Sequence, residues 1–86
     1  MKLIDTTIAL NKARIDYGGQ IFSRKEMEHI VYGAGLPKHN SMFHQCKEFK
    51  VFNTLAPNQY TFGKKPIYKG KVFNAYQTYR QKVKKS

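Results

Sequence analysis

Glycine, proline and asparagine residues divide this chain into short segments, and these breaks constrain its fold more than any other feature. Gly18-Gly19 and Gly35-Leu36-Pro37 favour helix ends, because glycine adopts left-handed conformations and the residue before a proline avoids helical ones. Ala56-Pro57-Asn58 is typical of a tight turn, and Gly63-Lys64-Lys65-Pro66 is a further break. A chain of 86 residues divided in this way predicts one domain, residues 1–86, with a single core.

The first segment, residues 3–16, is predicted to be a helix that ends at the glycine pair. Its N-terminal cap is expected to be Asp5, Thr6 or Thr7. Its apolar side chains cover a broad sector, with Leu3, Leu10 and Tyr17 on one side and Ile4, Ile8 and Ile15 on the neighbouring side. Residues 20–22 follow as a short extended segment.

The best-marked helix covers residues 23–34. Ser23 and Glu26 have the spacing of a capping box, in which each side chain accepts a hydrogen bond from the backbone amide of the other residue. An apolar face then recurs at the spacing of one buried helical side, formed by Met27, Ile30, Val31 and Ala34.

A third helix is expected from about residue 40 to about residue 50, with Asn40 as its cap. At 100° per residue its inward side comprises Met42, Cys46 and Phe49, with Phe43 at the margin. Gln45 points sideways. The opposite side is polar and is expected to face solvent: Asn40, Ser41, His44, Lys47 and Glu48.

Two β-prone runs, residues 51–55 and 59–62, flank the proline turn and predict a two-stranded hairpin. A fourth helix is expected from about Lys71, and residues 80–86 are expected to form a frayed basic tail. One side of this helix is apolar and is expected to pack on the core or on a second copy of the chain, giving a homodimer: Val72, Tyr76, Tyr79 and Val83.

Basic charge is concentrated in the second half of the chain. Residues 1–37 contain five basic and four acidic residues, a net charge of +1, whereas residues 38–86 contain eleven basic residues and Glu48 alone, a net charge of +10. A surface made only for solubility mixes both signs, because a one-sided cluster repels itself. The asymmetry therefore predicts a polyanionic partner, most simply a nucleic acid.

The order of the expected elements (helix, short strand, helix, helix, hairpin) resembles the winged helix-turn-helix family over about residues 3–65. Residues 23–34 resemble the first helix of the helix-turn-helix pair, residues 35–39 its turn and residues 40–50 its recognition helix. The hairpin resembles the wing. Two features depart from the pattern: the turn is longer than the shortest type, and the expected wing tip carries no Arg or Lys. The C-terminal helix would be an addition.

The resemblance implies an α+β fold in which the third helix enters the major groove of double-stranded DNA and the wing contacts the backbone. The side chains expected on the base edges and nearby phosphates are Asn40, Ser41, His44 and Lys47. A sequence-independent electrostatic contribution would come from Lys38, Lys50, Lys64, Lys65, Lys69 and Lys71. Two of these residues have simpler interpretations, since Asn40 can be a helix cap and His44 a plain surface residue.

Catalytic, metal-binding and membrane functions find little support in the sequence. His39, His44 and Cys46 have different helical phases and lack a fourth partner, so no zinc site is expected, and burial makes Cys46 a poor nucleophile. The glycines lack the spacing of a phosphate-binding loop. No apolar run reaches the roughly 20 residues of a membrane span. We expect a non-enzymatic cytoplasmic domain without a cofactor or small-molecule ligand.

The function predicted from the sequence is therefore binding of double-stranded DNA, as a small transcriptional regulator or an accessory DNA-binding factor. Two alternatives stay open at this point. The same fold could dock an acidic protein partner, or the basic and aromatic residues could bind RNA or single-stranded nucleic acid.

Overall fold

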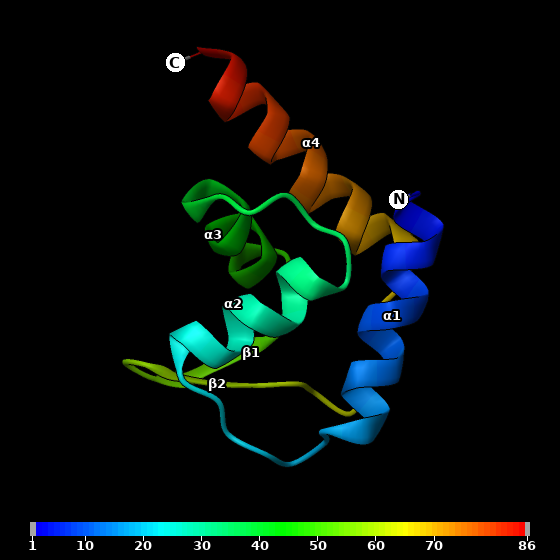
Figure 1. Ribbon diagram of the computed structural model, residues 1–86, viewed down its shortest axis with the longest axis vertical. Helices are drawn as coiled ribbons and strands as arrows, with labels where there is room; N and C mark the ends of the chain where they lie inside the picture. The colour runs from blue at the N-terminus through cyan, green and yellow to red at the C-terminus, as the bar shows by residue number, and fades with distance from the viewer. Residues whose placement is uncertain (1, 86) are drawn as a thin grey trace.

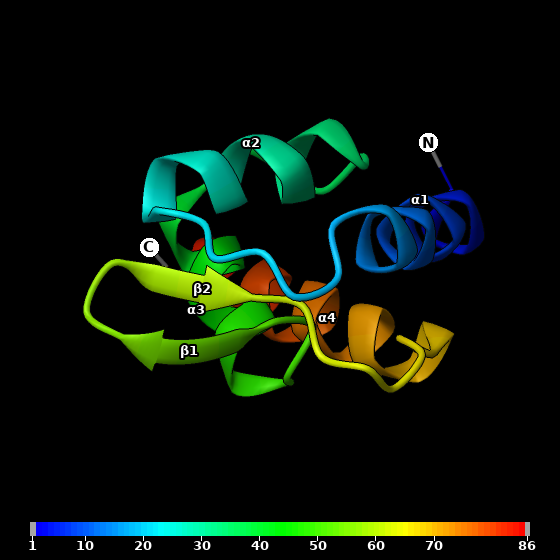
Figure 2. The same ribbon diagram turned by 90° about the horizontal axis from the view of Figure 1, so that it is seen from below.

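A computed structural model of the chain describes residues 2–85 and has an α+β architecture of four helices and a two-stranded antiparallel hairpin (Figure 1). The elements are α1 (Leu3–Asp16), α2 (Arg24–Gly33), α3 (Asn40–Glu48), β1 (Asn53–Ala56), β2 (Gln59–Thr61) and α4 (Lys69–Lys85). The hairpin lies at one end of the molecule and α1 at the other, with α2 between them on one side (Figure 2).

Helix α1 spans the predicted residues and ends before the glycine pair, with Gly19 in the left-handed region at φ +84°. The cap prediction for this helix is wrong. Lys2 holds the N-cap position without a side-chain cap bond, and the hydroxyl groups of Thr6 and Thr7 donate to carbonyls one turn earlier. Both threonines are buried, because these bonds satisfy their hydroxyl groups inside the fold.

The predicted apolar sector of α1 is only partly buried. Leu10 lies in the core, whereas Ile4, Ile8 and Ile15 are exposed and Tyr17 is 41% exposed. The helix turns its threonine side inward instead, since a buried threonine that bonds its own backbone needs no further partner. The prediction is therefore correct for the side that carries Leu10 and wrong for the side that carries Ile4, Ile8 and Ile15.

Helix α2 begins with the predicted capping box. The Ser23 hydroxyl accepts from the Glu26 amide, and the Glu26 carboxylate accepts from the Ser23 amide at 2.9 Å. Hydrogen bonding of the Glu26 carboxylate to Ser23, first to the backbone amide and second to the side chain, lowers the pKa of Glu26. Met27 and Val31 are fully buried on the predicted face.

Helix α3 begins at the predicted residue, but His39 caps it in place of Asn40. Nδ1 of His39 accepts a hydrogen bond from the Ser41 amide at 3.0 Å. The helix ends at Glu48, two residues before the predicted end, and Lys50 turns the chain with a positive φ of 61°. Phe49 is only half-buried, whereas Phe43, expected at the margin, is 1% exposed.

The hairpin is shorter and shifted relative to the prediction. Asn53 pairs with Thr61 and Thr54 with Tyr60, and an irregularity at Leu55 precedes the tight turn, in which Asn58 adopts φ +62°. Phe22 extends the pairing with two backbone hydrogen bonds to Tyr60, at 2.7 and 2.9 Å. The expected extended segment is therefore a single bridge beside β2.

An aromatic cluster of Phe43, Phe52 and Tyr60 forms the centre of the core, with ring centroids 4.9–5.5 Å apart. Helix α4 closes the core from the other side, packing along α3 and against α1 (Figure 1). Val72 and Ala75 are fully buried there, so Val72 packs inside the chain and is not available to a second copy. The helix begins at Lys69, earlier than predicted, and continues to Lys85 where a frayed tail was expected; residue 86 lies outside the described residues.

Candidate nucleic-acid interface

The polar side of α3 is presented to solvent. Asn40, His44 and Lys47 are exposed and Ser41 is half-buried, so the four side chains predicted to contact bases lie on one helical face, which we call the α3 front. The back of the same helix is anchored by Met42, Phe43 and Cys46 in the core. Because packing on the back fixes the helix rotation, the α3 front points away from the protein.

His39, in the turn between α2 and α3, contacts side chains of α2 and α4. The Tyr32 hydroxyl donates to the His39 carbonyl at 2.8 Å, while the His39 ring lies 5.4 Å from that of Tyr79 on α4. Burial, and secondarily the nearby Glu28 carboxylate, raises the pKa of Tyr32 to about 12. This tyrosine therefore stays a hydrogen-bond donor through the neutral range and holds the start of α3 in place.

Arg24 connects the start of α2 with α3 and the hairpin, and we call this cluster the Arg24 junction: Arg24, Glu28, Asn40, Phe43 and Asn58. Its guanidinium pairs with Glu28 at 2.8 Å, donates to the Asn40 side chain and lies 4.9 Å from the centre of the Phe43 ring. Its backbone amide donates to Asn58 at the hairpin turn, at 2.9 Å. The hairpin tip is thus bound to α2 rather than free.

Sequence reasoning missed Arg24 as a residue of this region. Its position at the start of a capped helix gave no indication of contacts 16 and 34 residues along the chain. Asn40 does not cap α3; its side-chain oxygen accepts from Arg24, and its amide nitrogen is still available to donate. Its contact with bases stays a prediction.

Glu48, the single acidic residue of the basic half, is engaged within the protein. Gln45 is fully buried and not sideways as predicted. With its amide oriented to satisfy both neighbours, its nitrogen donates to the Glu48 carboxylate at 3.0 Å and its oxygen accepts from Lys82 on α4 at 2.9 Å. This chain of bonds connects Glu48 through Gln45 to Lys82 on α4.

Four of the predicted basic residues come together around one concavity of about 390 Å³, which we call the lysine pocket. Lys50 follows α3, Lys64 and Lys65 belong to the segment after β2, and Lys71 stands in the first turn of α4. The other residues that line it are Val51, Asn53, Gly63 and Ile67. No acidic side chain is among these eight, and the backbone amide of Lys50 bonds the Lys47 carbonyl at 3.2 Å, which joins the pocket to the end of the α3 front.

Two predicted basic residues lie apart from the lysine pocket. Lys38 faces a concavity on the α2 side together with Glu28 and Tyr32. Lys69 lies beside Phe73 at the start of α4. The structure thus gathers Lys50, Lys64, Lys65 and Lys71 and leaves Lys38 and Lys69 outside the group.

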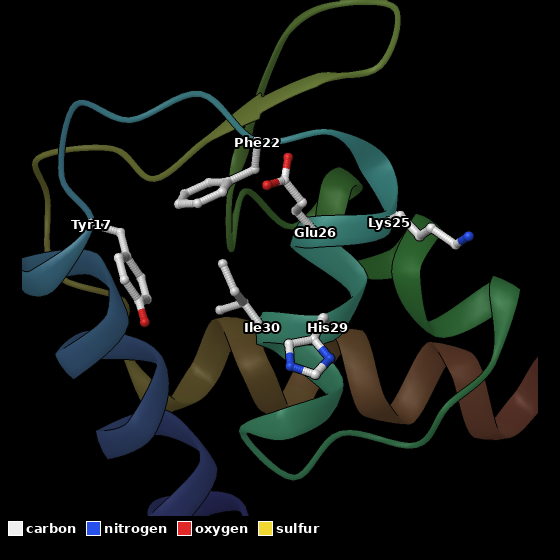
Figure 3. Close-up of a pocket in the computed structure, with 6 residues that line it drawn as sticks. All are labelled: Tyr17, Phe22, Lys25, Glu26, His29 and Ile30. Carbon is white, nitrogen blue, oxygen red and sulfur yellow. The ribbon is translucent and has the colours of Figure 1, made fainter.

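A second concavity, of about 450 Å³, lies between the end of α1 and α2 and is mainly apolar. Figure 3 shows Tyr17, Phe22 and Ile30 around this cavity, with the Lys25 amine directed away from it. The rings of Tyr17 and Phe22 meet edge to face at 5.7 Å. The Glu26 carboxylate at its edge belongs to the capping box, so this concavity adds no positive charge to the candidate interface.

Cys46 is buried among the core side chains, and burial raises the pKa of its thiol to about 12. It is therefore uncharged at neutral pH and unsuited to nucleophilic attack. No three His, Cys, Asp or Glu side chains within the described residues gather closely enough to hold a metal ion.

Comparison of the chain with known protein families, with curated proteins and with solved structures found no match. Within residues 2–85, none of the helices combines the length and the apolar character required to cross a bilayer.

Proposed function

We propose that this protein binds double-stranded DNA through the α3 front and the lysine pocket. The observation that carries the proposal is that the two groups of residues follow one another along the chain and are joined by the backbone hydrogen bond from Lys50 to Lys47. The α3 front ends at Lys47, and the lysine pocket begins three residues later at Lys50. A polar helix face beside a cluster of lysines matches what a duplex presents, namely base edges in a groove and phosphates along its rim.

The α3 front and the lysine pocket would contact different parts of the duplex. Asn40, Ser41 and His44 supply donors and acceptors that suit base edges, and the exposed Lys47 suits a guanine or a phosphate. The lysines of the pocket supply the charge that releases counterions from the duplex, which gives affinity without sequence preference. Apart from Glu48, which is bound to Gln45, residues 38–86 offer no acidic group to oppose this.

The winged helix-turn-helix arrangement belongs to the same proposal. The order of the elements, the bridge from Phe22 to β2 and the exposed polar side of α3 support it. The hairpin differs from a free wing, since Asn58 at its turn is bound to Arg24. We therefore assign the backbone contacts to the lysine pocket and not to the hairpin tip. A transcriptional regulator and an accessory DNA-binding factor both need such an interface.

Fluorescence anisotropy of labelled duplex DNA at low salt tests the proposal, with single-stranded DNA, RNA and an acidic peptide as competing ligands. Lys47→Ala and His44→Ala should weaken duplex binding more than Lys12→Ala, because Lys12 is an exposed lysine on α1, away from the α3 front. Equal effects of the three substitutions exclude α3 as the contact surface. Absence of duplex binding at low salt, or tighter binding of another ligand, overturns the proposal.

A further inference from the structure

The lysine pocket has a concave shape that a duplex backbone does not require. Three separate segments of the chain converge on it: the corner after α3, the segment after β2 and the start of α4. A flat or convex basic surface is sufficient for backbone contacts, which are spread along the duplex. Four lysines that line one concavity instead concentrate positive charge around a single small volume.

The segment that carries Lys64 and Lys65 is fastened to α1. The Arg14 guanidinium donates to the Lys64 carbonyl at 3.0 Å. The Asn11 side chain holds the buried Ile67 at both backbone groups, accepting from its amide at 2.8 Å and donating to its carbonyl at 2.6 Å. These bonds set the pocket wall before any ligand arrives, and a preformed wall loses little entropy on binding.

The corner at Lys50 is also fixed. Lys50 adopts φ +61°, a conformation that is unfavourable for a residue with a side chain. The next residue, Val51, is buried and its amide donates to the Cys46 carbonyl at 2.9 Å, which anchors the turn to α3. The Lys50 side chain therefore leaves the backbone at a defined place on the pocket rim.

The start of α4 makes this region still more positive. The unbonded amides at a helix N-terminus carry partial positive charge, and acidic residues normally stand there. The first turn of α4 has no acidic residue and carries Lys69 and Lys71 instead, with the Lys71 amine 5.4 Å from the centre of the Tyr68 ring. Within the described residues the lysines of the pocket form no ion pair. A bound anion would relieve this repulsion.

We propose that the lysine pocket binds a compact, multiply charged phosphate group, either a phosphomonoester or a diphosphate. A phosphodiester of an intact backbone carries one negative charge and leaves most of the four lysine charges unneutralised. A phosphomonoester carries about two negative charges at neutral pH and a diphosphate more, so each matches the pocket better. The group can belong to the phosphorylated end of a nucleic-acid strand or to a free nucleotide. Binding of the free anion does not depend on the proposed duplex binding.

Isothermal titration calorimetry of the full chain with inorganic pyrophosphate, at low salt, tests this inference. Pyrophosphate should bind more tightly than inorganic phosphate, and K65Q/K71Q should weaken it by about tenfold or more, as expected for loss of two charge-assisted contacts. The matched control K12Q/K25Q removes two exposed lysines from α1 and α2 and should change affinity less than about twofold. Equal losses in the two double variants, or no measurable binding, overturn the inference.

A second set of titrations distinguishes the sources of the phosphate. A strand-end ligand predicts that a 5′-phosphorylated oligonucleotide binds more tightly than its 5′-hydroxyl counterpart, with the difference removed in K65Q/K71Q. A free-nucleotide ligand predicts that ADP binds more tightly than pyrophosphate while the two oligonucleotides bind alike. Pyrophosphate binding without duplex binding would overturn the proposed function and leave this inference standing. Duplex binding without pyrophosphate binding would overturn this inference and leave the proposed function standing.

Discussion

Two regions of this small domain use basic residues in opposite ways. At the Arg24 junction, one guanidinium contacts Glu28, Asn40 and the ring of Phe43, and the neighbouring backbone amide is bound by Asn58. Four lysines line the lysine pocket, and none of them forms an ion pair among the described residues. The first arrangement ties together helix, helix and hairpin. The second places like charges close together, which opposes folding and favours an anion.

The comparison teaches that positive charge in this chain has two separate uses. A basic side chain with several partners inside the protein positions the elements and is not available to a ligand. Basic side chains that line one concavity without ion-pair partners remain available to an anion, and their mutual repulsion favours binding. Substitutions in the two regions should therefore affect stability and binding in different proportions.

The largest effect is expected at the Arg24 junction, from Phe43→Ala. Phe43 is 1% exposed and contacts Arg24, Phe52 and Tyr60, so its truncation leaves a cavity in the aromatic cluster and should lower the free energy of unfolding by about 3–5 kcal/mol. Urea denaturation measures it. Phe73→Ala is the matched control, because this phenylalanine is 42% exposed, and it should cost about 0.5 kcal/mol or less. Comparable losses would mean that the aromatic cluster is not the centre of the fold.

Alkaline pH should weaken the core behind α3. Burial raises the pKa of the Cys46 thiol from its ordinary value of 9.0 to about 12. The thiol of the unfolded chain therefore ionises first, and the stability that the neutral thiol contributes is complete below pH 9 and is lost progressively as pH rises toward 12. Thermal unfolding measured from pH 8 to pH 11 should show this decline, and Cys46→Ala should make it shallower. An unchanged decline in the variant would assign it to other groups.

Ser23→Ala should reduce stability by about 1 kcal/mol, because it removes the side-chain half of the capping box at the start of α2. The start of α2 carries the Arg24 junction, so the substitution also tests how firmly that cluster is held. Chemical denaturation gives the change in unfolding free energy, and Ser41→Ala, on the exposed side of α3, is the control. An equal loss of unfolding free energy in Ser41→Ala would show that the capping box contributes no more to stability than an ordinary surface serine.

The smallest change in the free energy of unfolding is expected from K64Q/K65Q, and any change should be an increase where the other substitutions cause a decrease. Removing two of the like charges from the lysine pocket should leave the unfolding free energy unchanged or raise it by a few tenths of a kcal/mol. The gain should be largest at low salt, where screening is weakest. A stability loss of 1 kcal/mol or more would mean that these lysines have structural partners, and the contrast between the two regions would fail.

Local signals in the sequence predicted local structure well. The breaks at Gly18-Gly19 and Pro57 and the capping box at Ser23 located the helices and the hairpin to within a few residues. These features depend only on residues that are close together in the sequence, so the sequence is sufficient to predict them. The polar side of α3 followed from helical phase for the same reason.

Features that depend on distant residues could not be predicted in this way. Ile8 is more hydrophobic than Thr7, yet Ile8 is exposed and Thr7 is buried. Thr7 can be buried because its hydroxyl group donates to the Leu3 carbonyl of its own helix. Gln45 was placed sideways and is fully buried, since its partners Glu48 and Lys82 come from two helices. The sequence named the lysines that would add electrostatic affinity but not their grouping into one pocket, because only the folded chain brings Lys50 and Lys71 together.

The salt dependence of duplex binding tests the central claim most directly. The logarithm of the binding constant falls linearly with the logarithm of the salt concentration, with a slope of about −0.9 for each phosphate that the protein neutralises. If the lysine pocket contacts the duplex, K64Q/K65Q should bind with a slope shallower by about 2 than that of the unmodified protein, while K12Q/K25Q keeps the original slope. Identical slopes for all three proteins would contradict the account.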